Sequence, residues 1–381
     1  MHLPQVPRSA RLMLIVGVFH TAAMVWIAVS ALGYGDFPQL HDSAKALLAG
    51  SDLYTTPPTI QGTKNLNPPH LAILMAPLGA MSLPSAAFVM WGIIVMAAIV
   101  YAAAIGRTIS SPKGYMLFAI ILASAASGVA VSLINLAWPL AAATAWAWVW
   151  QREGRRRRSA IAIGCLASFK VFYLIFVPYW LWRRDFASAI WSVAALCAVL
   201  TTGLLIVGFA PYSEWLAVLQ NGSPLLSDRP LDASWHSVVT RLPLDHSSAL
   251  AVWLTGCAAG AAASWRRLRQ EANVDVHWAL ILTAMIILSP LGWVYYALIP
   301  ALPAALVLLR YRSSWVMPAI AVCSIVPPAA VVLTGLQMHH WIPSAIANSF
   351  YALTIMGAWL ALVAGRPDSL VVGDRVAQPL S

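Results

Sequence analysis

Two charged side chains stand beside or inside apolar runs of the sequence, where a charge is expensive. Asp36 follows the largely apolar residues 12–32 by a few positions. Its carboxylate should therefore lie at a membrane boundary, where it could act as a general base towards a hydroxyl group. Lys170 interrupts the apolar residues 159–182, and a charge inside such a run is by default a candidate functional group.

Each of these residues also has a structural explanation. Asp36 could cap a helix or be a solvated loop acid. Asp42 and Asp52 in the same loop have the same alternatives, and Asp42 could help to open a helix over residues 43–49. Lys170 could extend its alkyl chain from a short helix and hold its ammonium group at the interface.

The composition defines the elements that must position these groups. Of the 381 residues, 60% are hydrophobic and 9% are charged, whereas soluble domains carry about 25% charged residues. A soluble fold is excluded. Because a membrane-spanning helix uses about 20 residues, the apolar residues could supply about ten or eleven spans. The sequence therefore predicts an all-α polytopic membrane protein.

The positions of the charges predict its orientation. The net charge of +10 comes from 23 Lys and Arg against 13 Asp and Glu, and it could suggest a nucleic-acid partner. The basic residues cluster between apolar runs, however, at residues 155–158, 183–184, 266–269 and 310–312. The positive-inside rule places such clusters in the cytoplasm, so we expect membrane lipids and no nucleic acid as partners. The four cysteines are not closely spaced and predict neither a metal site nor a disulfide.

The apolar runs predict about 10–12 transmembrane helices in one integral-membrane domain over residues 1–381. Residues 68–82 are too short to cross and are interpreted as interfacial or re-entrant. Arginines flank both ends of residues 159–182, so the chain should turn back near Lys170. Both termini and the tail 366–381 are then cytoplasmic. The outside segments are residues 33–67 and 210–248, with Lys64 and Arg229 outside.

Five stretches of this sequence resemble one family in the same order along the chain. They read GDFPQLHDSAKALLAGSDLY, NPPHLAILMAPLG, ASFKVFYLIFVPYWLWRRDF, DASWHSVVTRL and LSPLGWVYYALIPALPA. The set resembles glycosyltransferase family 87, which comprises membrane enzymes of the GT-C class that use polyprenyl-phosphate sugars. Residues 232–234 read Asp-Ala-Ser where the family more often has Asn-Gln-Ser, and Tyr295 takes the place of a frequent His.

The resemblance implies a GT-C-like helical bundle and an inverting transfer of a hexose, with mannose as the first expectation. The donor would be a polyprenyl-phosphate sugar and the acceptor a lipid or glycan hydroxyl, on the outer face of the cell membrane. Asp36 would be the catalytic base, and Lys170 and Arg241 would hold the donor phosphate. No metal and no cofactor is expected. Substrate contacts are expected from Asp42, Tyr54, Asp232, Ser234, His236, Trp293 and Tyr295.

Several of these roles have alternatives in the residues themselves. Arg241 could anchor its loop through Asp232 or Asp245. His236 could stabilise the acceptor or donate to a phosphate, and it could equally be an interfacial histidine with structural partners. Trp293 and Tyr295 can stack on a sugar, although aromatic residues are common at membrane interfaces.

Two rival functions stay open on the sequence alone, a transporter or flippase of lipid-linked sugars and an inactive glycolipid-binding scaffold. A transporter needs ionisable groups along a path through the membrane, and the predicted spans contain few besides Lys170. An enzyme needs Asp36, Lys170 and Arg241 to converge on one outward cavity.

Overall fold

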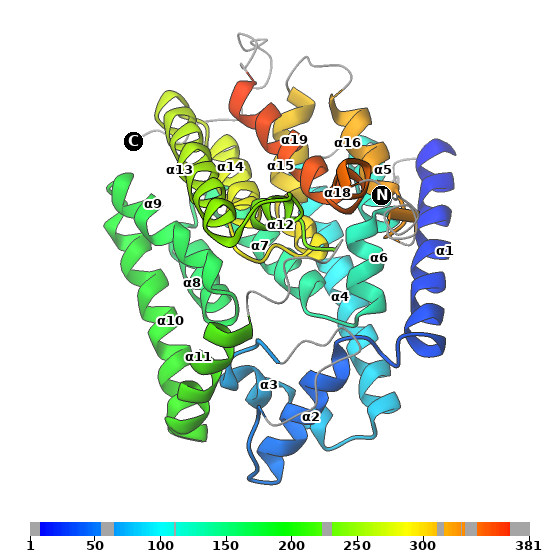
Figure 1. Cartoon of the computed structure of the whole chain (residues 1–381), viewed down its shortest axis with the longest axis vertical. Coiled ribbons are helices and arrows are strands. Elements are labelled where there is room, and N and C mark those ends of the chain that lie inside the picture. Colours follow the sequence, from blue (N-terminus) through cyan, green and yellow to red (C-terminus); the bar gives the residue numbers. More distant parts are fainter. Residues whose placement is uncertain are drawn as a thin grey trace, which may run out of the picture.

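The computed structural model describes residues 8–54, 65–109, 112–222, 231–310, 316–328, 330–331 and 341–365, and Figure 1 shows the chain. Within these ranges the regular structure is helical, and the β pairing is a single isolated bridge between Asp232 and Trp293. The all-α prediction is confirmed. The predicted tail 366–381 and the predicted outside positions of Lys64 and Arg229 lie outside the described residues.

Four described helices are long and apolar enough to cross a membrane, and two bent helix pairs could each make a further span. The long helices are α1 (Arg8–Ser30), α4 (Leu83–Thr108), α10 (Phe186–Val207) and α13 (His246–Gln270). The bent pairs are α5 (Pro112–Ala123) with α6 (Ala125–Ser132), and α18 (Trp341–Asn348) with α19 (Phe350–Ala364). The chain is therefore a multi-pass membrane protein.

This count of four to six is lower than the 10–12 spans expected from the sequence. The difference lies in the core, where the apolar helices are short. They include α14 (Val274–Ile287) and α15 (Leu298–Arg310), which pack with the also short α7 (Ala137–Arg152) and α8 (Arg156–Phe169). Fourteen residues of helix extend about 21 Å, which is less than the roughly 30 Å of a hydrocarbon core. The apolar run over residues 68–82 likewise forms a short helix, α3 (Pro69–Gly79).

The short helices pack together and the long ones surround them. Helix α7 contacts α4, α8 and α15, and α14 contacts α15 and α19. Large aromatic side chains fill this core, among them Trp138, Trp148 and Trp278, each no more than 1% exposed. By contrast α1 and α10 expose many apolar side chains, which is the pattern of a helix that faces lipid.

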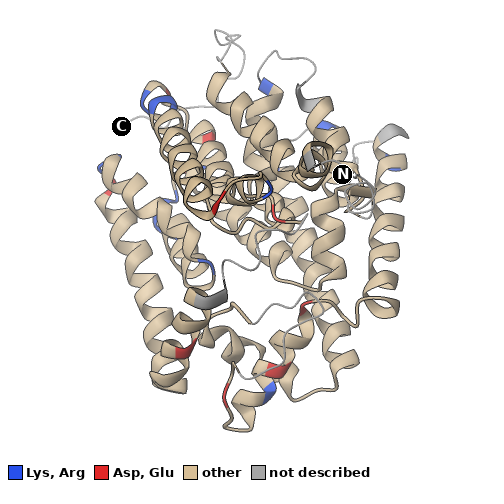
Figure 2. Cartoon of the chain, in the orientation of Figure 1, with Lys and Arg blue, Asp and Glu red and all other residues tan. Residues whose placement is uncertain are grey.

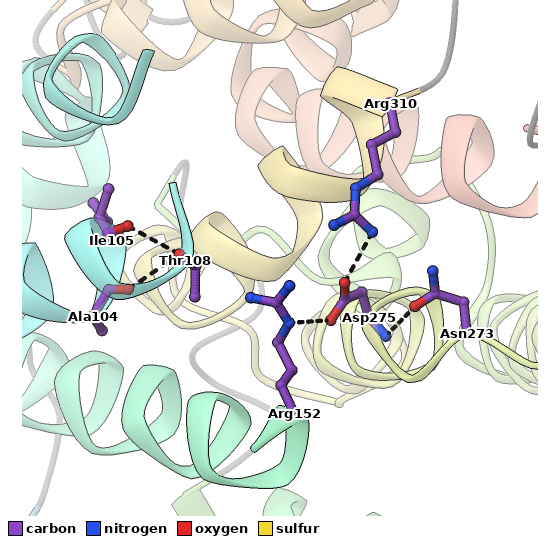
Figure 3. A network of polar contacts seen from close by, with 7 residues as sticks. All are labelled: Ala104, Ile105, Thr108, Arg152, Asn273, Asp275 and Arg310. Atoms are coloured by element: carbon purple, nitrogen blue, oxygen red, sulfur yellow. Dashed lines mark hydrogen bonds and ion pairs between the residues drawn. The ribbon is translucent and has the colours of Figure 1, made fainter. Parts of the chain in front are cut away.

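One end of the core is closed by an ion-pair network around a buried carboxylate (Figure 3). The Asp275 side chain at the start of α14 is 5% exposed and lies between two arginines. Arg152 Nε of α7 is 3.0 Å from Oδ1, and Arg310 Nη1 of α15 donates to Oδ2 at 2.9 Å. The Asn273 side chain accepts the Asp275 N–H at 2.8 Å and caps α14. These contacts fix the ends of three core helices together.

The predicted turn of the chain near Lys170 is confirmed. Helix α8 ends at Phe169, Lys170 is extended, and the chain continues in η1 (Val171–Ile175) and α9 (Phe176–Trp182). Arg156 Nη1, at the start of α8, is 3.8 Å from Asp185 Oδ2, just past the end of α9. The two arginine-rich ends of this hairpin therefore lie side by side.

The first helix of the loop after α1 begins earlier than predicted. Helix α2 covers Phe37–Leu48 and has Asp36 at its N-cap position, so the predicted start at residue 43 is wrong and Asp42 lies in the helix interior. Pro38 suits the first turn. Phe37, Leu40 and Ala44 are buried and share one face, which gives the helix a side to pack.

Charges are separated along the molecule. In the orientation of Figure 2, most Lys and Arg lie towards the upper end, whereas acidic residues of α2 and of α11 (Ala210–Gly222) lie towards the lower end. The core helices run between a basic end, marked by Arg152, Arg156 and Arg310, and an opposite end that holds Lys170 and residues 291–296.

Candidate active site

The segment of residues 291–296 follows α14 and includes most of η2 (Val294–Ala297). It is paired with a second loop at residues 231–234. Ala233 N donates to Gly292 O at 2.6 Å, and Val294 N donates to Leu231 O at 2.8 Å. The bridge between Asp232 and Trp293 belongs to this pairing. Two loops that are far apart in the sequence thus form one rigid platform.

Asp232 is the most buried acid of this platform, with a relative exposure of 0%. Its Oδ1 accepts from Ser234 N and from Gly292 N, both at 3.0 Å. Burial raises the pKa of Asp232 to about 6, although these two N–H donors and the charge of Arg241 act to lower it. Its Oδ2 is buried and has no hydrogen-bond partner among the described residues. The carboxyl group therefore supports the platform from inside and keeps one buried oxygen without a described hydrogen-bond partner.

The short helix α12 (Trp235–Thr240) follows directly and positions Arg241. Ser234 is its N-cap, and its Oγ accepts from Ser237 N at 3.1 Å. Arg241 Nη1 donates to Ser237 Oγ at 3.3 Å and to Ser349 Oγ at 3.1 Å. Arg241 therefore joins α12 to the start of α19, and its charge acts to lower the pKa of Asp232.

Asp36 is held by a close approach of two chain segments. Its N–H donates to Leu133 O at 3.0 Å, and the preceding residues Tyr34 and Gly35 both have positive φ angles, 71° and 65°. A Cβ on Gly35 would lie 2.5 Å from Leu133 Cα, so only glycine fits. The carboxylate makes no capping bond to α2 and interacts electrostatically with Tyr295.

Lys170 approaches the same platform from the hairpin. Its Nζ donates to Asn67 Oδ1 at 3.1 Å and lies 5.7 Å from the centre of the Tyr296 ring. The rings of Tyr295 and Tyr296 are 4.7 Å apart. Lys170 therefore meets this tyrosine pair on one ring, and Asp36 interacts with the other.

Of the three predicted charges, Lys170 lies over the ring of Tyr296. Asp36 and Arg241 act on the platform through their charges, Asp36 on Tyr295 and Arg241 on Asp232. Trp293 and Tyr295 belong to that segment and stack on each other, with ring centres 6.0 Å apart.

Other predicted residues lie at the margin. Tyr54 donates its hydroxyl to Asn67 O at 2.8 Å and so supports the residue that binds Lys170. His236 packs edge-on against Trp253 at 5.1 Å. The Asp42 side chain is 47% exposed and lies 3.6 Å from His41, and no described contact links it to residues 291–296.

The sequence reasoning missed Asn67 and Ser349. Asn67 is held by Asn65, which accepts hydrogen bonds from its N–H and its side-chain amide at 2.9 and 3.0 Å. Its position before two prolines was a usable signal, because an amide that ends a polar loop there must point at another element. Ser349 carried no such signal. Among the residues that the structure describes, no group of three or more His, Cys, Asp or Glu could hold a metal ion.

These observations define the class of the protein. It is a helical membrane protein in which acidic and basic side chains act on one platform of two paired loops. Residues 65–290, more than half of the chain, match glycosyltransferase family 87. The chain belongs to that family and is a glycosyltransferase, as the sequence resemblance predicts. The match includes Lys170, Asp232 and Arg241, whereas Asp36 and Tyr295 lie outside it. No curated protein matches the chain.

Proposed function

We propose that this glycosyltransferase moves a hexose, with mannose as the first choice, from a polyprenyl-phosphate donor to a hydroxyl group of a lipid or glycan acceptor. One observation carries the proposal: the charges of Asp36, Lys170 and Arg241 all act on the platform, at Tyr295, Tyr296 and Asp232 respectively. A carboxylate and two cations around one platform suit a reaction in which a hydroxyl group loses a proton and a phosphate leaves.

The chemistry assigns one task to each charge. The acceptor oxygen attacks the anomeric carbon, the bond from that carbon to the phosphate oxygen breaks, and its electron pair leaves with the phosphate. Asp36 takes the acceptor proton. Lys170 and Arg241 stabilise the leaving phosphate by charge-assisted hydrogen bonds. A single displacement inverts the configuration at the anomeric carbon.

The sugar would lie against the platform itself. Trp293 and Tyr295, each 7% exposed, would be its aromatic contacts, and the buried Asp232 would act on it through the Gly292 N–H that it holds. Ser234 and His236 complete this wall beside α12. Asp42 and Tyr54 stay predictions for the acceptor side, with Tyr54 acting through Asn67.

An apolar cavity supports a lipid-linked donor. It has a volume of about 140 Å³ and lies between α5, α6, α15, α16 (Val316–Ile325) and α19. Its lining begins at Ala297 and Leu298, directly after the tyrosine pair, and continues along Ala301 and Ala304. A phosphate held near Tyr296 would direct its prenyl chain towards this cavity, whereas the soluble part of a nucleotide sugar would gain nothing from it.

The separation of charges supports an orientation with the platform outside and both termini in the cytoplasm (Figure 2). Arginine-rich loops favour the cytoplasmic side. The enzyme would then act in the cell membrane on substrates of the outer leaflet.

The proposal is tested by measuring the transfer of the sugar to an acceptor directly. Purified full-length protein in nanodiscs is incubated with a panel of polyprenyl-phosphate sugars and extracted envelope lipids, and products are identified by mass spectrometry. A product with inverted configuration that disappears with Asp36→Asn supports the proposal. Movement of intact donor across the bilayer without any transfer would favour a flippase, and donor binding without either activity would favour a scaffold.

A further inference from the structure

A second cavity, lined by polar side chains, lies at the basic end of the core, away from the platform. It has a volume of about 780 Å³ and is formed where α7 ends, α8 begins, the hairpin closes after α9 and α14 begins. Five arginines line it: Arg107, Arg152, Arg155, Arg156 and Arg183. We call it the arginine cavity. Helix α8 runs from this cavity to Lys170, a length of about 21 Å for its 14 residues.

The arginine cavity carries more positive than negative charge. Only two carboxylates, Glu153 and Asp185, are among its lining residues. Glu153 is shared, because Arg107 lies 2.8 Å and Arg155 lies 3.4 Å from its two oxygens. The excess of guanidinium groups attracts a polyvalent or phosphate-type anion.

Two arginines of the cavity are not fully neutralised by the described carboxylates. Arg156 is 3.8 Å from Asp185, whose other oxygen already accepts from Ser188 N to cap α10. Arg183 has no ion pair among the described residues and lies 5.8 Å from the ring of Trp182. These two arginines come from the two ends of the hairpin, so one anion between them would bridge both ends.

The wall of the arginine cavity offers further donors. Trp180 is 1% exposed and lines the cavity, and its buried Nε1 has no hydrogen-bond partner among the described residues. Arg155 occupies the N-cap position of α8 without a side-chain cap, so N–H groups of the first turn lack a side-chain acceptor there. Tyr179 and Trp180 also give the cavity an aromatic wall of the kind found at lipid head groups.

We propose that the arginine cavity binds the phosphate of an anionic membrane lipid and thereby bridges Arg156 and Arg183. Guanidinium groups match phosphate oxygens in geometry and charge. The bound phosphate fixes the two ends of the hairpin whose turn carries Lys170. This site is separate from the transfer reaction and does not depend on it.

Binding to the full-length protein in detergent tests the proposal. The ligands are dioctanoyl phosphatidylglycerol, dioctanoyl phosphatidylcholine and inorganic phosphate, and bound lipid is measured by native mass spectrometry. The double variant Arg156→Gln/Arg183→Gln should bind phosphatidylglycerol at least about tenfold more weakly, since each lost charged hydrogen bond is worth about a factor of ten.

The control is the double variant Arg158→Gln/Arg184→Gln, which removes the same charge from neighbouring residues that do not line the cavity. It should keep the affinity of the unmodified protein. Equal losses in both double variants would show mere attraction to a basic surface and overturn the proposal. So would phosphatidylcholine binding as tightly as phosphatidylglycerol, or inorganic phosphate binding with the same variant dependence while the lipid does not.

Discussion

At the scale of single residues, a substitution of Asp36 should affect the transfer reaction without affecting donor binding. Asp36→Asn keeps the size of the side chain but cannot accept the acceptor proton, so turnover should fall by about 10²–10⁴-fold. Donor affinity should be unchanged. Asp42→Asn is the comparison variant, because Asp42 lies on the helix that Asp36 starts and its side chain is 47% exposed. A contact of Asp42 with the acceptor would raise the KM for the acceptor and leave turnover at saturation unchanged. Normal turnover of Asp36→Asn together with an inactive Asp42→Asn would reassign the base.

The two cations make the complementary prediction. Lys170→Met and Arg241→Gln should each weaken binding of a polyprenyl phosphate by about tenfold or more, since a charge-assisted contact is lost. Titration of the purified protein with the lipid measures this effect. Arg241→Gln should also lower thermal stability, because Arg241 joins α12 to Ser349. Unchanged affinity in both variants would show that the donor phosphate does not bind at Lys170 and Arg241.

The buried carboxyl group of Asp232 should make the stability of the folded protein depend on pH. Its pKa is raised from 3.8 to about 6, so the folded protein binds this proton more tightly than the unfolded chain does. Stability should therefore fall as the pH rises from about 4 through 6 and be lowest, for this residue, above that range. In Asp232→Asn this contribution should vanish, which melting temperatures between pH 4 and pH 7 can measure. An identical pH profile in both proteins would contradict the burial of an ionisable group here.

At the scale of elements, the approach of residues 33–36 to residues 132–134 sets the position of Asp36. Gly35 and Gly50 have the same φ of 65°, but a Cβ would lie 2.5 Å from Leu133 Cα at Gly35 and would contact nothing at Gly50. Gly50→Ala should therefore cost about 1 kcal/mol, the price of φ alone. Gly35→Ala should cost clearly more and reduce turnover. Thermal unfolding and transfer assays compare the two, and equal effects would mean that the close approach is not required.

The elements also show how far sequence reasoning reaches. The hairpin at Lys170 could be predicted because arginines at both ends of one apolar run demand a turn, and that rule is local. The start of α2 could not, because the burial of Phe37 and Leu40 against other helices decides it. The contact of Lys170 with Asn67 joins residues 103 positions apart, which one sequence without relatives does not reveal.

At the scale of the whole molecule, the two polar ends should face opposite sides of the membrane. In a background without the four native cysteines, Lys45→Cys on α2 should react with an impermeant thiol reagent in intact cells. Arg158→Cys and Arg184→Cys should react only after lysis. If Arg158→Cys and Arg184→Cys were labelled on different sides of the membrane, the hairpin would be contradicted. If Lys45→Cys were protected in intact cells, the proposed orientation would be reversed.

The same scale explains why the class of protein could be predicted while the number of spans could not. Composition is a property of the whole chain and survives any packing. Whether an apolar run crosses depends on helix length and bending, as at Ser124 between α5 and α6, where the pair bends by 51°. The Ser124 side chain accepts Ser127 N there and starts a new helix, a break that hydropathy does not show.

The shortness of the core helices has a consequence for the depth at which the platform lies. Helices α8 and α14, with 14 residues each, extend about 21 Å, so with the basic end at one interface the platform lies roughly 9 Å short of the other side of a 30 Å hydrocarbon core. The surrounding helices α4 and α10, with 26 and 22 residues, extend about 39 and 33 Å, so lipid meets helices of full length and the shortfall lies inside the protein. A substrate head group would then descend below the level of its neighbours and lose bulk water before it reacts.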